Sequence, residues 1–116
     1  MLDDAYTSAC KAVPDAFSVN CHVSPDEYVL VLGGQADVAA GPVLADALSQ
    51  ASAYRHARVS VDLAGLEFID AYCLAIIFGA RDELRDRGTD LVLRSPRPPV
   101  RRLLDILARQ DLIENA

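Results

Sequence analysis

The alternation of apolar and polar residues is the first clear pattern along the chain. In FSVNCHVS, residues 17–24, the two kinds of residue alternate one by one, and this period of two is typical of a strand with one buried face. The turn-forming SPDE leads into the continuous apolar run YVLVL, residues 28–32, which predicts a strand covered on both faces. Because the link between them is short, we expect the two strands to form an antiparallel hairpin.

Helical and strand patterns alternate through the rest of the chain. Apolar residues at helical spacing predict a helix from Gly41 to about Ser52, in which Gly41 is the N-cap and Pro42 the first helical residue. A second helix is expected to begin near Ala71 and to stop at Gly88. Strands are predicted over 58–69 and 90–95, and a third helix over 98–110.

The first residues carry a weaker helical pattern. Apolar side chains recur at helical spacing over residues 2–13, with acidic residues first and Lys11 late, which suits a short helix before Pro14. The predicted organisation is therefore an N-terminal extension over 1–16, containing this short helix, and one globular domain over 17–116.

The order of the predicted elements, β-β-α-β-α-β-α after the optional N-terminal helix, indicates a single α/β domain. Strands that alternate with helices pair in parallel through crossovers. We expect a mixed, mostly parallel sheet of four to five strands, with an antiparallel first hairpin and three main helices.

Composition narrows the classes of function. The chain has 116 residues and a formal net charge of −6, which disfavours direct binding to nucleic acid or anionic lipid. The acidic start is unlike a secretory signal, and no apolar run approaches the ~18–20 residues of a membrane span. We therefore expect a cytoplasmic protein without membrane insertion. The three cysteines, Cys10, Cys21 and Cys73, lack metal-type spacing, and reduced thiols are expected.

The residues that usually carry catalysis are sparse. The two histidines, His22 and His56, are expected to be a surface residue of a strand and a linker residue. No metalloprotease, serine-hydrolase or P-loop motif is present. The segment LGGQAD has two glycines after a strand but lacks the Gly-x-Gly-x-x-Gly pattern of a dinucleotide-binding turn, so a nucleotide- or small-ligand-binding module is the least favoured alternative. We expect a non-enzymatic binding domain with no catalytic residue, metal or cofactor.

One stretch makes the comparison with a known family specific. The segment VSVDLAGLEFIDAYCL, residues 59–74, resembles the signature of STAS domains, in which a hydrophobic strand and an aspartate precede Ser-Ser-Gly-Leu or Ser-Thr-Gly-Leu at a helix start. The loop after YVLVL resembles the Gly-x-x-Asp segment of that family, with Gly34 and Asp37 in the matching places. Residues 89–114 resemble its closing strand and helix, so the likeness covers about residues 17–114.

The resemblance implies a function that the residues alone do not. Small bacterial STAS proteins commonly act as anti-anti-sigma factors: they bind an anti-sigma factor that is itself a Ser/Thr kinase, and phosphorylation of the second hydroxyl residue after the aspartate breaks that binding. Here the phosphoacceptor-equivalent position is Tyr72, preceded by Ala71 and followed by Cys73 in place of glycine. A tyrosine oxygen lies roughly 5 Å further out than a serine oxygen. We therefore hypothesise that Tyr72 is not phosphorylated and that the domain keeps its binding surface without the switch.

The residues that the resemblance assigns to partner binding have simpler structural interpretations as well. Tyr72 is either a contact residue or an aromatic packed at a helix start, Asp70 either a contact or an N-cap, and Asp37 either a contact or the former of an Asx-turn. The full predicted set is Gly34, Asp37, Asp70, Ala71, Tyr72 and Cys73. The alternative function is a structural STAS subunit of a signalling assembly or the accessory of a transporter ATPase, and homodimer formation is left open.

Overall fold

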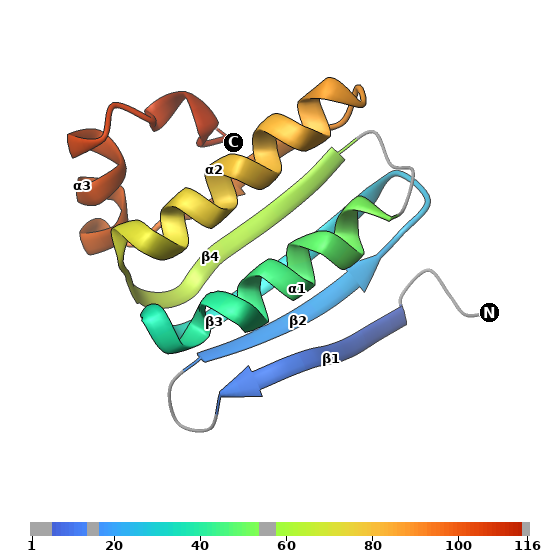
Figure 1. Ribbon diagram of the computed structural model, residues 1–116, viewed down its shortest axis with the longest axis horizontal. Helices are drawn as coiled ribbons and strands as arrows, with labels where there is room; N and C mark the ends of the chain where they lie inside the picture. Colours follow the sequence, from blue (N-terminus) through green and yellow to red (C-terminus); the bar gives the residue numbers. More distant parts are fainter. Residues whose placement is uncertain (1–5, 14–16, 54–57, 115–116) are drawn as a thin grey trace.

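The protein forms one mixed β-sheet with helices packed on it (Figure 1). The computed structural model describes residues 6–13, 17–53 and 58–114. The five strands follow one another across the sheet in chain order: β1 (Tyr6–Val13), β2 (Phe17–Val23), β3 (Glu27–Ala36), β4 (Arg58–Ile69) and β5 (Asp90–Arg94). The β1–β2 and β2–β3 pairs are antiparallel, whereas β3–β4 and β4–β5 are parallel. The predicted mixed sheet and its antiparallel β2–β3 hairpin are confirmed.

The first two helices connect the parallel strands, and the third follows the last strand. They are α1 (Gly41–Ser52), α2 (Ala71–Asp86) and α3 (Pro98–Ile106), with short 3-10 helices η1 (Val38–Ala40) and η2 (Gln110–Leu112). Figure 1 shows α1 and α2 side by side over one face of the sheet, as expected for two successive right-handed crossovers. Among the described residues, none of the helices is long and apolar enough to cross a membrane.

Two helix boundaries differ from the sequence expectation. The N-cap of α1 is Ala40 rather than Gly41, which is itself helical, with φ −50° and ψ −54°. The third helix ends at Ile106 instead of reaching residue 110, because Ala108 adopts a left-handed backbone conformation with φ 57°. An α-helix cannot continue through such a residue.

The helix predicted for residues 2–13 is wrong where the structure describes it. Residues 6–13 form β1, which pairs with β2 from Tyr6 opposite Val23 to Val13 opposite Phe17. A helix of about 12 residues is marginal in water on its own, whereas the free edge of β2 offers a ladder of backbone hydrogen bonds. Residues 2–5 and Pro14 lie outside the described residues, and the domain boundary at residue 17 stays a prediction.

The core lies between the sheet and the two crossover helices. The apolar residues of β2–β5 that point toward the helices pack against the inner stripes of α1 and α2, whose fully buried members include Leu44, Leu74 and Ile77. Burying one such side chain contributes about 1.5–3 kcal/mol to folding. This packing fixes where each helix begins relative to the end of the strand before it.

The cysteines Cys21 and Cys73 differ in their bonding state. Cys21, on β2, is disulfide-bonded, so the expectation of reduced thiols is wrong for this residue; its spacing in the sequence carried no signal of that bond. Cys73, in the first turn of α2, is a free and buried thiol.

A network of charged residues lies on the opposite face of the sheet. Glu27, Arg58 and Ser60 alternate along their strands with core residues and so point away from the helices. The Ser60 hydroxyl donates to the Glu27 carboxylate, and Arg94 donates to Glu27 at 2.5 Å and to Glu114 at 2.6 Å. Hydrogen bonds from Arg94 and then from Arg58 lower the pKa of Glu114. The stability from these bonds is present at neutral pH and is lost as the pH falls through that lowered pKa.

We predict that Leu74→Ala lowers the free energy of unfolding by about 2–5 kcal/mol, because Leu74 is fully buried and its truncation leaves a cavity beneath α2. Ile106→Ala is the control: this side chain is 72% exposed, and its loss should change the same quantity by less than about 0.5 kcal/mol. Chemical denaturation followed by circular dichroism measures both. Equal effects of the two variants would contradict the described core.

Candidate functional site

The candidate site lies where β3 and β4 end. These strands run parallel, with Ala36 opposite Ile69, so the segments that follow them leave the sheet at the same edge. After β3 the chain forms η1 and begins α1; after β4 it passes through Asp70 into α2. The Asp70 N–H donates to the Ala36 carbonyl at 3.0 Å. The loop of residues 37–40, called the β3–α1 loop below, therefore lies beside the first turn of α2.

Asp70 caps α2. Its backbone is extended, and its Oδ1 accepts a hydrogen bond from the Cys73 N–H at 2.8 Å. This is the usual geometry of an aspartate N-cap, and the carboxylate also complements the positive end of the helix dipole. The capping interpretation of Asp70 is confirmed, while its contact with a partner stays a prediction.

Asp37 organises the β3–α1 loop in a similar way. It is the N-cap of η1, and its Oδ1 accepts from the Ala39 N–H at 3.0 Å. Its backbone carbonyl accepts from the Ala40 N–H at 2.9 Å and from the Cys73 thiol at 3.1 Å. The local-turn interpretation of Asp37 is confirmed. Its side chain is nevertheless exposed, so a contact role is sterically open to it.

Tyr72, in the first turn of α2, contacts the start of α1 from the surface of the protein. Its side chain is 53% exposed, and its ring lies against Gly41, the first residue of α1. A Cβ added to Gly41 would come within 2.6 Å of Tyr72 Cε2 and 3.4 Å of the Tyr72 hydroxyl. Gly41 has an ordinary helical backbone that any residue adopts. Glycine leaves the space that the Tyr72 ring occupies, so a larger residue here would make the ring shift, whereas the backbone conformation itself does not call for glycine.

The other three predicted site residues occupy different environments. Ala71 is exposed beside Tyr72, whereas Cys73 is fully buried and cannot touch a partner directly. Burial raises the pKa of the Cys73 thiol to about 12, and the Asp70 carboxylate, as a hydrogen-bond acceptor for the thiol, and the charges of Asp70 and Asp37 add to that rise. Gly34 lies inside β3, opposite Leu66, with φ 85°. That left-handed conformation explains the glycine, but it places Gly34 in the sheet and not in the loop.

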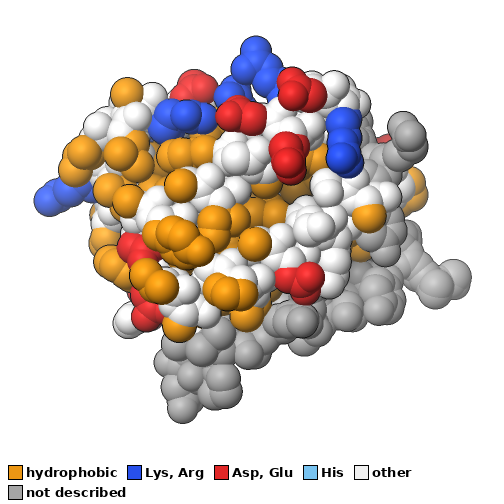
Figure 2. Space-filling model, in the orientation of Figure 1, with side chains coloured by type: hydrophobic (Ala, Val, Ile, Leu, Met, Phe, Trp, Pro, Cys, Tyr) orange, Lys and Arg blue, Asp and Glu red, His pale blue; other side chains and the backbone are white. Residues whose placement is uncertain are grey.

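Two exposed apolar residues of this surface are not among the predicted site residues. Val38 in η1 is 67% exposed, and Phe68 near the end of β4 is 46% exposed. With Tyr72 they form what we call the apolar rim, the exposed apolar residues Val38, Phe68 and Tyr72. Figure 2 shows hydrophobic side chains gathered over the starts of α1 and α2. The sequence carried one signal of this exposure. Phe68 stands next to the apolar Ile69 and so breaks the alternation of apolar and polar residues at the end of the strand.

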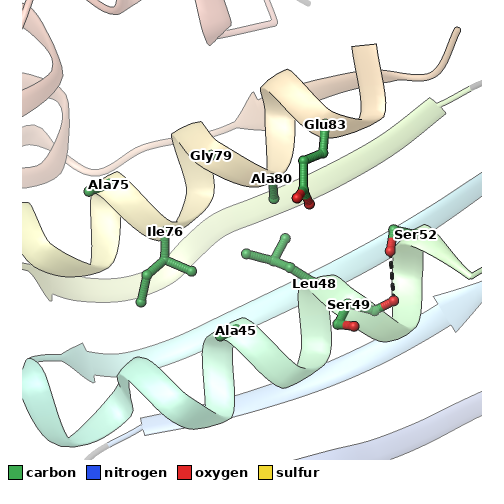
Figure 3. A pocket seen from close by; sticks show the side chains of 9 residues that line it. All are labelled: Ala45, Leu48, Ser49, Ser52, Ala75, Ile76, Gly79, Ala80 and Glu83. Atoms are coloured by element: carbon green, nitrogen blue, oxygen red, sulfur yellow. Dashed lines mark hydrogen bonds between the residues drawn. The ribbon is translucent and has the colours of Figure 1, made fainter. Parts of the chain in front are cut away.

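A groove runs along α1 and α2 behind this site (Figure 3). It has a volume of about 290 Å³ and is lined mainly by small side chains, with Ile76 near one end and the Glu83 carboxylate near the other. The LGGQAD loop does not line it. Within the described ranges, no three His, Cys, Asp or Glu side chains gather to hold a metal ion. His22 is exposed on β2, and His56 falls outside the described residues.

We predict that the effect of Gly41→Ala on the free energy of unfolding changes sign with the residue at position 72. In the wild type the new methyl group meets the Tyr72 ring, so the ring must shift and unfolding should become easier by up to about 1 kcal/mol. In a Tyr72→Ala background the methyl has room, and alanine should stabilise the helix by about 0.5 kcal/mol or more. Denaturant titration of the four proteins measures the coupling, and additive effects would contradict the contact.

Comparisons with known proteins agree with this architecture. The model of the family described as "Mlab, STAS domain" matches residues 20–114. An anti-sigma factor antagonist from Mycobacterium paratuberculosis superposes with a TM-score of 0.77 at 19% identity, covering 89% of this chain and 87% of that one. The antagonist SpoIIAA in its unphosphorylated form gives 0.75 at 22% identity, covering 87% and 88%.

A further structure shows the same fold in a modified state. The phosphorylated form of SpoIIAA, the Bacillus cell fate determinant, gives a TM-score of 0.69 at 20% identity, covering 87% of this chain and 91% of that one. No curated protein sequence matches this chain. The family match spans most of the chain, and with the observed order of strands and helices it shows that this protein belongs to the STAS domain family.

Proposed function

We propose that this domain is a cytoplasmic anti-anti-sigma factor, a regulatory binding protein that sequesters an anti-sigma factor of the Ser/Thr-kinase type. The observation that carries the proposal is the exposed Tyr72 at the helix start where STAS antagonists present their phosphoacceptor. The capping aspartate before it and the β3–α1 loop beside it are both in place. Proteins described as anti-sigma factor antagonists share the fold, which supports this role.

The apolar rim has the composition of a binding hot spot. It consists of a tyrosine and a phenylalanine, each about half exposed, and an exposed valine on a loop that is hydrogen-bonded in place. Aromatic side chains bury a large area at low entropic cost, and such residues carry most of the energy of an interface. Asp37 and Glu67 are exposed close to the rim in sequence. With the net charge of −6, this surface suits a partner with an apolar centre and a basic periphery.

The geometry of Tyr72 supports binding without a phosphorylation switch. The ring lies over Gly41, so the hydroxyl is held near the start of α1 and away from the place a serine hydroxyl would occupy on α2. A kinase site shaped for serine would have to detach the ring and accept an oxygen roughly 5 Å further from the backbone. The domain would then bind its partner regardless of kinase activity.

The absence of a serine or threonine from Ala71-Tyr72-Cys73 also favours a second candidate. A structural STAS subunit of a signalling assembly, or an accessory of a transporter ATPase, needs the same surface and no switch. Both candidates place the contact on the apolar rim and differ in the protein bound, so identification of the partner separates them.

We predict that Tyr72→Glu weakens partner binding at least tenfold, because it places a charge at the centre of an apolar contact. The experiment is an affinity capture from native cells, with mass spectrometry of the bound proteins and titration of the purified partner. Ile106→Glu, on the exposed end of α3, is the matched control and should bind like the wild type. An unchanged affinity in Tyr72→Glu would place the interface elsewhere, and a captured transporter ATPase would favour the structural role.

We predict that Tyr72→Ser restores phosphorylation by the kinase partner, because it returns a hydroxyl to the position that the kinase is shaped to reach. Incubation of both proteins with purified partner and ATP, followed by phosphosite mapping, should find phosphate on Ser only in the variant. The hypothesis fails if the wild-type protein acquires stoichiometric phosphate on Tyr72 and loses its partner.

A further inference from the structure

Cys73 contacts both elements that build the candidate site. Its thiol donates to the Asp37 carbonyl at 3.1 Å, across 36 positions of sequence, and its N–H donates to the Asp70 carboxylate at 2.8 Å. The side chain is fully buried. Cys73 thus links the β3–α1 loop to the first turn of α2 from below, while the Tyr72 ring covers the same junction from the surface.

The thiol supplies a link that the surrounding backbone does not. The Asp37 carbonyl already accepts from the Ala40 N–H within its own 3-10 turn, and the thiol occupies its second acceptor site. The glycine that STAS signatures carry at this position has no side chain with which to donate. The Asp70 N–H also donates to the Ala36 carbonyl, but Ala36 is the last residue of β3, so this hydrogen bond does not hold the loop itself.

We propose that Cys73 is a positioning residue whose thiol holds the β3–α1 loop against α2 and so fixes the placement of Val38 relative to Tyr72. Its effect on partner binding rests on the proposed function, whereas its effect on the loop does not. A displaced loop would carry Val38 and Asp37 away from the first turn of α2, where Tyr72 lies. Tyr72 could then no longer act together with Val38 as one contact surface.

Amide hydrogen exchange of the full chain, read residue by residue by NMR without any partner, tests the loop. Cys73→Ala removes the donor and should speed exchange at Ala39 and Ala40 about fivefold, as loss of one weak hydrogen bond implies. Cys73→Ser keeps a donor and should restore rates near those of the wild type. Ile77→Val, one turn further along α2 and equally buried, calibrates a general loosening of the core.

Three results of this experiment would overturn the proposal: equal exchange in Cys73→Ala and Cys73→Ser, unchanged loop exchange in Cys73→Ala, or a rise shared uniformly with amides at the far end of α2. If the alanine variant does not fold, iodoacetamide labelling of wild-type Cys73 gives a second test. A held loop predicts labelling only at the rate of unfolding. Labelling at the rate of an exposed thiol would contradict it.

The raised pKa of the Cys73 thiol is a second cause of slow labelling, because it lowers the thiolate fraction at neutral pH. Labelling at several pH values, compared with the denatured chain, separates this cause from steric protection of the buried thiol. A wild-type protein that captures no anti-sigma factor would refute the proposed function and leave the exchange result intact, so the two proposals fail separately.

Discussion

The parallel pairing of β3 with β4 is the contact on which the candidate site depends. Strands that run in the same direction end at the same edge, so the β3–α1 loop and the start of α2 meet although 33 positions separate the paired residues Ala36 and Ile69. Parallel pairing requires a crossover, and α1 provides it while burying its apolar stripe on the sheet. The core that stabilises the domain therefore also determines the position of its exposed surface.

Most of the fold was accessible from local patterns. The period of two in β2, the apolar run of β3 and the helical stripes of α1 and α2 each report burial, which a single strand or helix shows in its own sequence. The helix predicted for the N-terminal segment was wrong for the opposite reason. Its helical spacing is a local property, but β1 exists because β2 has a free edge, and the availability of that edge depends on the rest of the sheet.

The place of the candidate site in the chain could be predicted from the sequence, but the environment of each of its residues could be predicted only in part. The STAS-like signature identified Asp37, Asp70 and Tyr72, which the structure brings together. It also grouped with them Gly34, which lies inside a strand, and Cys73, which is buried. Val38 was not named individually, because exposure in a loop leaves no periodic signal. The space that Gly41 leaves was missed because it depends on a ring 31 positions away in the sequence.

The contact between Gly41 and Tyr72 constrains the order in which mutations can accumulate. A protein with serine at position 72 tolerates either glycine or a larger residue at position 41, since no ring competes for the space. A protein with tyrosine there, held as this one is, accepts a larger residue only if the ring moves from its place over Gly41. Glycine at position 41 therefore accommodates either serine or tyrosine at position 72, so a change at position 72 needs no second change. The effect of a change at position 41, in contrast, depends on which residue stands at position 72.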